Sequence, residues 1–331
     1  KLFYVIYFIL TSFLSIIIAK ENYVTMHVLE IFVLFFIFYV VYCYEKIDYC
    51  LHPDCSLRNQ HTLCVAENKR SPRLFSSGMT TWMRYQILLL HNRYRDNIAM
   101  GLDAGQPSAT NMRKMYWDHE LEKAAEVWAR QCQKRHDECR NTLRFNVLQN
   151  MDVRPIVPKI TEAQVLADAV GAWFSGARVI PAESVWSFRL SNCSAPGGCN
   201  ANWYATAAWA STWRLGCSQA LCTIKQRKCP SNRTSRNSFK TVTRTTPSLL
   251  QRTKSCKKNR DKNNNNKNKK RNDDGPKIIA YTFCNYGPAG NIDGFPIYEA
   301  GKPCTNCPQG TDCGDQKHRA LCAIIGDPDM S

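Results

Sequence analysis

The sequence predicts an α+β fold in which helices cover both faces of a β-sheet. Three segments have apolar residues spaced by three and four, the pattern of a helix with one buried face: 82–100, 112–139 and 161–174. Three later segments are rich in β-formers and aromatic residues and are predicted as strands: 203–212, 213–224 and 277–284. These elements together predict a three-layer α/β/α sandwich.

The chain has 331 residues and 17 cysteines, far more than a protein of a reducing compartment normally holds. The cysteines therefore predict a disulfide framework and an oxidising compartment. With 44% hydrophobic residues, the chain is able to form a substantial core.

Two apolar stretches lie near the start of the chain, at 2–19 and 28–44. Because Met26 is the first methionine, we interpret 26–44 as a secretory signal peptide and 1–25 as an upstream segment that the mature protein lacks. A membrane anchor is the alternative, but a run of this length is at the low end for a span and contains Glu30. We expect secretion, with membrane contact only through the signal peptide.

Cysteine-rich segments flank a predicted domain at 81–300. Residues 45–80 contain three cysteines without periodicity, which predicts a coil held by disulfides. The tail, 301–331, has a Cys-x2-Cys-x5-Cys-x8-Cys pattern, for which two disulfides are favoured over a zinc site in a secreted chain. The cysteines of the two segments are Cys50, Cys55, Cys64, Cys304, Cys307, Cys313 and Cys322.

The predicted helices have end signals. Gly101 is a natural residue just beyond the first helix, and Thr161 and Gln164 form a capping box ahead of the third. Asp118 caps the second, whose apolar stripe ends with Cys132 and then His136 on the same face. Residues 176–202, which contain Cys193 and Cys199, are expected to be irregular. Sequons make Asn192 and Asn232 candidates for glycosylation.

The formal net charge of +17 is concentrated in one segment, because residues 225–274 hold 17 Lys and Arg against 3 Asp and Glu. The insertion 225–276 has too few apolar residues to pack and is predicted to be disordered. A polyanion-binding arm, a neutral insertion and a gene-model artefact remain open, the last two together being favoured. Phe239 is its only aromatic residue, so no specific nucleic-acid partner is expected.

Several motifs, in order along the chain, resemble the CAP superfamily of cysteine-rich secretory proteins, antigen-5 and plant pathogenesis-related proteins. They are His91-Asn-x-x-Arg95, Trp117-Asp-x-Glu-Leu with Trp128, Cys132 and His136, the segment 203–217, and Cys284-Asn-Tyr with Gly287-Pro-x-Gly-Asn291. The sequence HDECRNTLRF resembles the insect antigen-5, or venom-allergen, branch. The resemblance covers about 47–322 without the insertion, and it implies the three-layer CAP fold.

The family's cleft commonly gathers two histidines and two acidic residues that can bind a divalent cation. Here His136 matches the first histidine, whereas Gln149, Gly176 and Trp203 stand at the other three positions. One imidazole and one amide cannot hold a cation tightly, so the resemblance implies no metal and no other cofactor at this site. For His91 a metal ligand is possible, but the pattern around it is structural in the family, which favours a buried histidine bonded to the backbone.

The resemblance also implies disulfides between Cys50 and Cys64, between Cys55 and Cys139, and between Cys217 and Cys284. The family's usual partner for Cys132 lies between the counterpart of Cys64 and the second helix, where this chain has no cysteine. The partner of Cys132 is therefore left open.

We therefore expect a secreted, non-enzymatic antigen-5-like protein, since no Ser/His/Asp or Cys/His catalytic set is recognisable. It would bind a hydrophobic small ligand, such as a sterol or fatty acid, or an extracellular protein. Gly176 and Trp203 would make the cleft more apolar than the family pattern, which favours lipid over metal. The alternatives are a metal-dependent hydrolase using His136 and a polyanion-binding module using 225–274.

Overall fold

The computed structural model describes residues 48–55, 60–103, 105–157, 160–192, 194, 198–224, 277–313 and 317–326. The chain divides into two compact units, Lys1–Tyr49 and Cys50–Ser331, and only Asp48 and Tyr49 of the first are described. The expected signal peptide, the upstream segment and the basic insertion lie outside the described residues. No described helix is long and apolar enough to cross a membrane.

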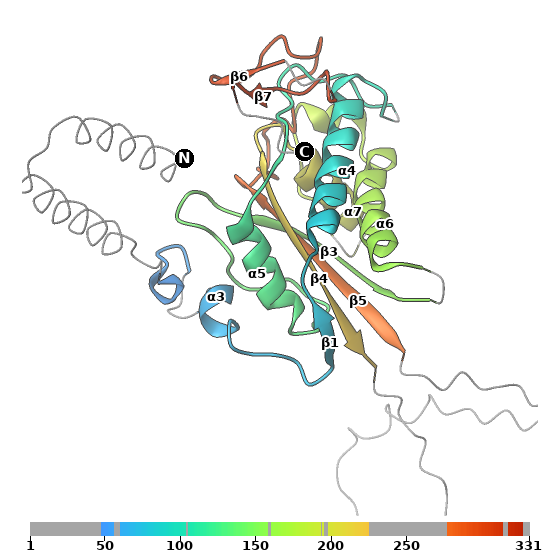
Figure 1. Cartoon of the computed structure of the whole chain (residues 1–331). Coiled ribbons are helices and arrows are strands. Elements are labelled where there is room, and N and C mark those ends of the chain that lie inside the picture. The colour runs from blue at the N-terminus through green and yellow to red at the C-terminus, as the bar shows by residue number, and fades with distance from the viewer. Residues whose placement is uncertain are drawn as a thin grey trace, which may run out of the picture. The chain divides into compact units, whose positions relative to one another are not determined.

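The second unit is built around one mostly antiparallel sheet (Figure 1). Its strands, in spatial order, are β1 (Leu74–Ser77), β4 (Arg214–Thr223), β5 (Ile278–Gly287) and β3 (Leu148–Pro155), with the short β2 (Tyr116–Trp117) pairing in parallel with β4. Thr223 pairs with Ile278 at the end of the β4–β5 ladder. The chain therefore leaves and re-enters the sheet at adjacent points on either side of 225–276.

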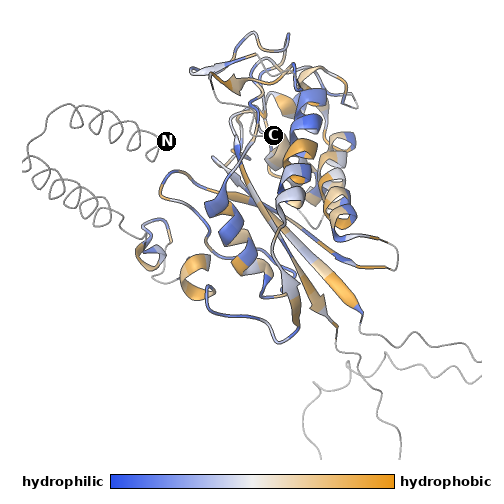
Figure 2. Cartoon of the chain, viewed as in Figure 1, coloured by the Kyte–Doolittle hydropathy of each residue, from blue (hydrophilic) through white to orange (hydrophobic). Residues whose placement is uncertain are grey.

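Helices cover both faces of this sheet, as predicted. Helix α5 (His119–Ala129) packs against β4 and β5 on one face, and α4 (Thr81–Ala99), α6 (Glu162–Phe174) and α7 (Gly198–Ala208) form the other layer (Figure 1). Figure 2 shows hydrophobic stretches along both the helices and the strands. Buried apolar residues from these elements pack together in clusters. The main core lies under α4, α6 and α7, and a smaller core lies under α5.

The predicted N-caps Asp118 and Thr161 are confirmed, but the capping box is incomplete, because the side chain of Gln164 donates to Asp168 at 2.8 Å. The side chain of Asp118 accepts from the backbone N–H groups of Glu120 and Leu121, and that of Thr161 accepts from Gln164. These bonds satisfy N–H groups that the first turn of a helix leaves without partners. Gly101 has φ of 72°, a left-handed conformation that ends α4.

Two predicted elements are wrong in extent or type. The helix expected to start at the cap Asp118 and to continue to His136 ends at Ala129, and Cys132 has φ of 52°, which no continuing helix can accommodate. His136 therefore does not share a helical face with Cys132. The strand expected at 203–212 is instead the end of α7, in which the alanines are strong helix formers and are buried.

The segments expected to be irregular contain short elements. They are η1 (Tyr49–Leu51), α3 (Thr62–Val65), η2 (Ser175–Arg178) and η3 (Ala182–Val185), together with β1 at the end of the 45–80 segment. Strands β3 and β1 were not predicted from the sequence. The tail forms a small two-stranded sheet of β6 (Thr311–Asp312) and β7 (Ala323–Ile324).

Six disulfides join described cysteines. The pairs Cys50–Cys64, Cys55–Cys139 and Cys217–Cys284 are those that the family resemblance implies, and the tail holds Cys304–Cys313 and Cys307–Cys322. The sixth answers the open question about Cys132, which bonds to Cys222. This bond ties the loop after α5 to β4, so the second cysteine comes from the sheet and not from the N-terminal segment.

Candidate functional site

A chain of polar side chains leads from His136 to α5. Nδ1 of His136 lies 2.8 Å from Oε1 of Gln149 on β3. The Gln149 amide donates to Oδ1 of Asn285 at 3.0 Å, and Asn285 donates to the carbonyl of Leu121 at 3.0 Å. Because an amide oxygen only accepts, the proton lies on Nδ1 of His136 and Nε2 keeps the lone pair.

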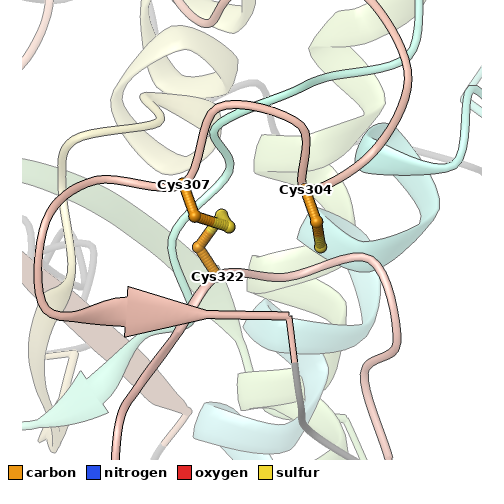
Figure 3. Close-up of side chains that lie close together, drawn as sticks. All are labelled: Cys304, Cys307 and Cys322. Carbon is orange, nitrogen blue, oxygen red and sulfur yellow. A yellow bond between two sulfur atoms is a disulfide. The ribbon is translucent and has the colours of Figure 1, made fainter.

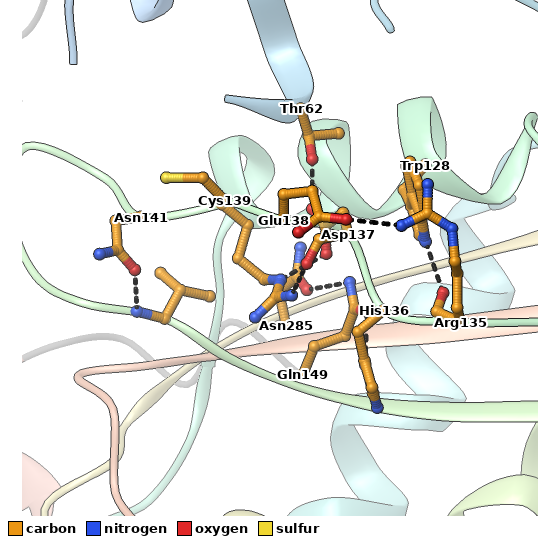
Figure 4. A network of polar contacts seen from close by, with 12 residues as sticks. Thr62, Trp128, Arg135, His136, Asp137, Glu138, Cys139, Asn141, Gln149 and Asn285 are labelled. Carbon is orange, nitrogen blue, oxygen red and sulfur yellow. Dashed lines mark hydrogen bonds and ion pairs between the residues drawn. The ribbon is translucent and has the colours of Figure 1, made fainter. Parts of the chain in front are cut away.

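The loop after α5 holds His136 in place (Figure 4). On one side Nε1 of Trp128 donates to the carbonyl of Arg135 at 2.8 Å. On the other side the buried carboxylate of Asp137 accepts a hydrogen bond from the hydroxyl of Thr62 in α3. The cysteine-rich N-terminal segment therefore helps to position the histidine.

The His136 imidazole is neutral at physiological pH. Packing removes water from part of the ring and lowers its pKa, although the residue as a whole is exposed. The hydrogen bond to Gln149 opposes this effect, and the nearby Arg140 adds to it. The partner amide supplies no negative charge, so the pair is a poor ligand set for a divalent cation.

The other two predicted cleft positions have different surroundings. An added Cβ on Gly176 would stand 2.1 Å from the carbonyl oxygen of Asn200 and 2.7 Å from Cβ of Tyr204, both in α7. Trp203 packs its half-buried ring against the main core, and its carbonyl accepts from Asn150 at 2.9 Å. The sequence predicts that Gly176 makes a cleft more apolar, whereas the glycine lies against the backbone of α7. It allows η2 to approach the backbone of α7.

Of the four predicted cleft positions, all of them described residues, His136 and Gln149 are hydrogen-bonded to each other, but neither is bonded to Gly176 or Trp203. Gln149 and Asn150 are consecutive in β3, so their side chains point to opposite faces of the sheet. Within the described part of the chain, no hydrogen bond or ion pair joins His136 or Gln149 to Gly176 or Trp203. The polar pair is therefore not hydrogen-bonded to the two positions at α7.

Among the described residues, potential metal ligands come within reach of one another at one place, in the tail. The sulfur atoms of Cys304, Cys307 and Cys322 all lie within 4.8 Å of one another (Figure 3). Each belongs to a disulfide, and a disulfide sulfur has no thiolate charge to give to a metal. In this oxidised form the cluster is therefore not a zinc site.

His91 has a structural role, as favoured from the sequence. It is fully buried in α4, with Nδ1 2.8 Å from the carbonyl of Ile87 and Nε2 2.9 Å from the hydroxyl of Tyr286. Both ring nitrogens are therefore occupied by hydrogen bonds. Burial lowers the pKa of His91 to about 4, so the ring is neutral.

Two separate hollows lie along the seam between α4 and α6. The larger is a groove with a volume of about 320 Å³, lined by Tyr94, Leu102, Asp103, Gly171, Phe174, Ser175, Ala177 and Arg178. A second hollow of about 170 Å³ lies along the N-terminal halves of the same helices, beside the exposed Trp82. Phe174 stacks on Tyr94 with 4.6 Å between ring centroids and meets His91 edge-on at 5.8 Å. The aromatic part of the wall is therefore preformed.

The sequence did not point to this groove. Tyr94 belongs to the periodic stripe of α4, and Phe174 ends the stripe of α6, so each is read as a core residue. Only the pairing of the two helices shows that they border an open groove. Of the glycosylation candidates, Asn192 is exposed and accepts from the backbone of Ser194 at 2.9 Å, whereas Asn232 lies outside the described residues.

Comparisons with known proteins agree with the motifs. Residues 88–232 match the model of the cysteine-rich secretory protein family, CAP. Venom allergen 5 of Rhynchium brunneum is 30% identical over 173 residues, which cover 49% of this chain and 73% of that protein. Venom allergen 5 of Tityus serrulatus is 26% identical over 291 residues, covering 87% of this chain and 56% of that protein.

The chain spans a little over half the length of several relatives that it matches, such as CRISP/Allergen/PR-1 of Trittame loki at 54%. The structure of BmVAL-1 aligns with a TM-score of 0.46 and 20% identity over 77% of this chain and 98% of that one. On the sequence relatives and the ordered motifs, this chain belongs to the cysteine-rich secretory protein (CAP) family and resembles its venom allergen 5, or antigen-5, members.

Proposed function

We propose that this protein is secreted and acts by binding a hydrophobic small ligand, not as an enzyme. Its disulfides and its venom-allergen relatives support secretion. The non-enzymatic role is supported by the partner of His136, because the amide of Gln149 can neither take up a proton nor stabilise an imidazolium by charge.

The observation that carries the proposal is the groove beside Tyr94 and Phe174. Its volume of about 320 Å³ reaches the lower end of the range of small-ligand sites, roughly 300–1,000 Å³. Leu102 is 69% exposed at its edge, and a large aliphatic side chain in that position favours an apolar occupant. The ligand is therefore proposed to bind in this groove, and not at the four positions that correspond to the family's metal site.

The shape of the site favours a fatty acid over a sterol. The groove holds about 320 Å³, at the lower end for small-ligand sites, which suits a slender acyl chain better than a bulky ring system. Arg178 is exposed at the edge of the larger hollow, where its guanidinium would be able to meet a carboxylate. Asp103 also lines this hollow, and its negative charge would disfavour a ligand carboxylate relative to a neutral hydroxyl. The experiment below therefore compares ligands with an acid and with an alcohol headgroup.

The test is a titration of the delipidated protein with a fluorescent fatty acid, followed by displacement with palmitate, the corresponding fatty alcohol and a sterol. The variant Gly171→Leu should weaken binding about tenfold or more, because Cβ at this position already stands 3.4 Å from the Tyr94 hydroxyl and a leucine would fill the groove. Lys123→Leu adds the same side chain to α5, on the other face of the sheet, and should leave binding unchanged.

Arg178→Gln provides a second readout. It should weaken the acid severalfold and leave the alcohol unaffected, because only the acid can form the charged hydrogen bond. No uptake of the probe by the unmodified protein, or equal uptake by Gly171→Leu, would show that the groove is not a lipid site.

A further inference from the structure

The two disulfides of the tail lie unusually close to one another. Cys304 is bonded to Cys313, yet its sulfur lies within 4.8 Å of both sulfurs of the Cys307–Cys322 bond (Figure 3). Thiol–disulfide exchange proceeds by attack of a thiolate on a neighbouring disulfide sulfur. A thiolate on Cys304 would therefore begin next to a disulfide that it could attack.

Solvent can reach these four cysteines to different degrees. Cys313 is exposed, Cys304 and Cys307 are half-buried, and Cys322 is only 1% exposed. A thiolate from solution can therefore approach the Cys304–Cys313 bond at Cys313, which makes Cys304 the leaving group. The Cys307–Cys322 bond is shielded on its Cys322 side.

The strand register supports a second pairing of the same cysteines. In the β6–β7 ladder, Thr311 lies opposite Ile324 and Asp312 lies opposite Ala323. One further step along this antiparallel register sets Cys313 opposite Cys322. Directly opposed residues have Cα atoms about 4.5–5.5 Å apart, within the range that disulfides span.

We propose that the tail is a thiol–disulfide exchange site for a low-molecular-weight thiol, with two interconvertible pairings. The thiolate attacks Cys313, forming a mixed disulfide and releasing the thiolate of Cys304. Cys304 then attacks Cys307, forming the Cys304–Cys307 bond and releasing the thiolate of Cys322. Cys322 attacks the mixed disulfide at Cys313, forming Cys313–Cys322 and returning the small thiolate. Two disulfides are broken and two are formed, with no net oxidation.

The exchange changes which segment is tied to the CAP core. Cys322 is held on the core because its N–H donates to Met112 at 2.8 Å and its carbonyl accepts from Lys114 at 3.0 Å. It therefore stays in place while its partner changes from Cys307 to Cys313. The turn between Cys304 and Cys307 then closes on itself and loses its covalent link to the core.

The experiment incubates the full-length oxidised protein with a series of reduced and oxidised glutathione mixtures, then traps it with acid and alkylating reagent. Disulfides are mapped by peptide mass spectrometry. Glutathione should appear first on Cys313, and the Cys304–Cys307 and Cys313–Cys322 peptides should then appear together. The Cys50–Cys64 bond, also half-buried at both ends, is the internal control. The tail should exchange about tenfold faster or more, because its attacking sulfur is already in place.

A double variant, Cys307→Ser with Cys322→Ser, removes the acceptor bond. In it the thiolate of Cys304 can only return to Cys313, so the glutathione adduct should revert to the Cys304–Cys313 bond and no second pairing should form. In the unmodified protein the adduct should instead be replaced by the Cys313–Cys322 bond. The proposal is wrong if glutathione first modifies another cysteine. It is also wrong if the two tail bonds are reduced independently and no Cys304–Cys307 peptide forms at any glutathione ratio. Because these outcomes are read from the unmodified protein, they hold even if the variant fails to fold.

Discussion

Nε2 of His91 and the hydroxyl of Tyr286 lie 2.9 Å apart in the main core, joining α4 to β5. Nδ1 of His91 donates to the carbonyl of Ile87, so Nε2 must accept from the tyrosine hydroxyl. This arrangement satisfies every polar atom of a neutral imidazole. It leaves no acceptor for the second proton of an imidazolium unless the tyrosine hydroxyl turns round.

The first prediction concerns stability below pH 6.5. Burial lowers the pKa of His91 from 6.5 to about 4, so the unfolded state binds the proton more readily between these values. Stability should therefore fall as the pH drops from about 6.5 to 4, by about 3 kcal/mol from this residue alone. Urea unfolding at several pH values measures this loss.

His91→Gln cannot gain the proton and should lose that part of the pH dependence, although it is less stable at pH 7. His61, whose pKa is also lowered by burial, still contributes to the slope in both proteins, so the difference between them isolates His91. His119→Gln, which changes an exposed histidine, is the control. If the free energy of unfolding depends on pH equally in His91→Gln and in the unmodified protein, protonation of His91 is not the cause of the loss.

The second prediction concerns Arg95, which is fully buried in α4. Its guanidinium donates to backbone carbonyls of Arg113, Ala207, Trp209, Ala210 and Thr212 at 2.8–3.2 Å. Lysine cannot reproduce this planar set of donors and would leave several buried carbonyls without partners. Arg95→Lys should lower the free energy of unfolding by about 3 kcal/mol or more.

A matched control for Arg95 is Arg93→Lys, an exposed arginine two residues earlier in the same helix. Its change should stay within about 0.5 kcal/mol. Thermal or urea unfolding measures the loss of stability in Arg95→Lys and in Arg93→Lys. Comparable small changes in the two would mean that the carbonyl contacts of Arg95 contribute little.

The third prediction concerns the Cys132–Cys222 bond, which closes 90 residues of chain. Replacing both cysteines by serine should cost about 4 kcal/mol, because the cross-link restricts a large loop in the unfolded chain. Cys304–Cys313 spans only 9 residues, so the same replacement there should cost about 2 kcal/mol less. Urea unfolding under non-reducing conditions measures both, and a reversed order would refute the loop-entropy explanation.

The fourth prediction compares two glycines near the end of α6. Gly176→Ala should destabilise the protein by about 1–3 kcal/mol, because the new Cβ would collide with the backbone of α7. At Gly171 the nearest atom to a Cβ is 3.4 Å away, and the position is inside a helix, so Gly171→Ala should be neutral or stabilise by up to about 1 kcal/mol. The melting temperatures of Gly176→Ala and Gly171→Ala, each compared with that of the unmodified protein, test this difference.

The fifth prediction concerns the family's metal-binding residues, and whether they would bind a divalent cation if they were introduced at positions 149, 176 and 203. Restoring the family residues with Gln149→Glu, Gly176→Glu and Trp203→His should not create a tight site for a divalent cation, because a glutamate side chain at 176 would collide with the backbone of α7. Isothermal titration with zinc, compared with the unmodified protein, checks this. Stoichiometric tight binding would show that the four positions do converge.

The local residue pattern was sufficient to predict the helices and strands that are determined by residues close together in the sequence. The apolar spacing and caps of α4, α5 and α6 and the β-formers of β4 and β5 could be recognised from the sequence. These elements also predicted the three layers, and the family motifs added three disulfide pairs. The buried role favoured for His91 followed from the same motif.

Contacts between distant segments decided the rest. The stretch near Trp203 forms helix α7, whose buried alanines pack in the main core, and α5 ends early where Cys132 turns toward Cys222 in the sheet. The groove at Tyr94 exists only because α4 and α6 lie side by side. Likewise, the proximity of Cys304 to a second disulfide depends on the folded tail. Sequence spacing determines which face of an element is apolar, whereas the residues that this face meets depend on how the whole chain packs.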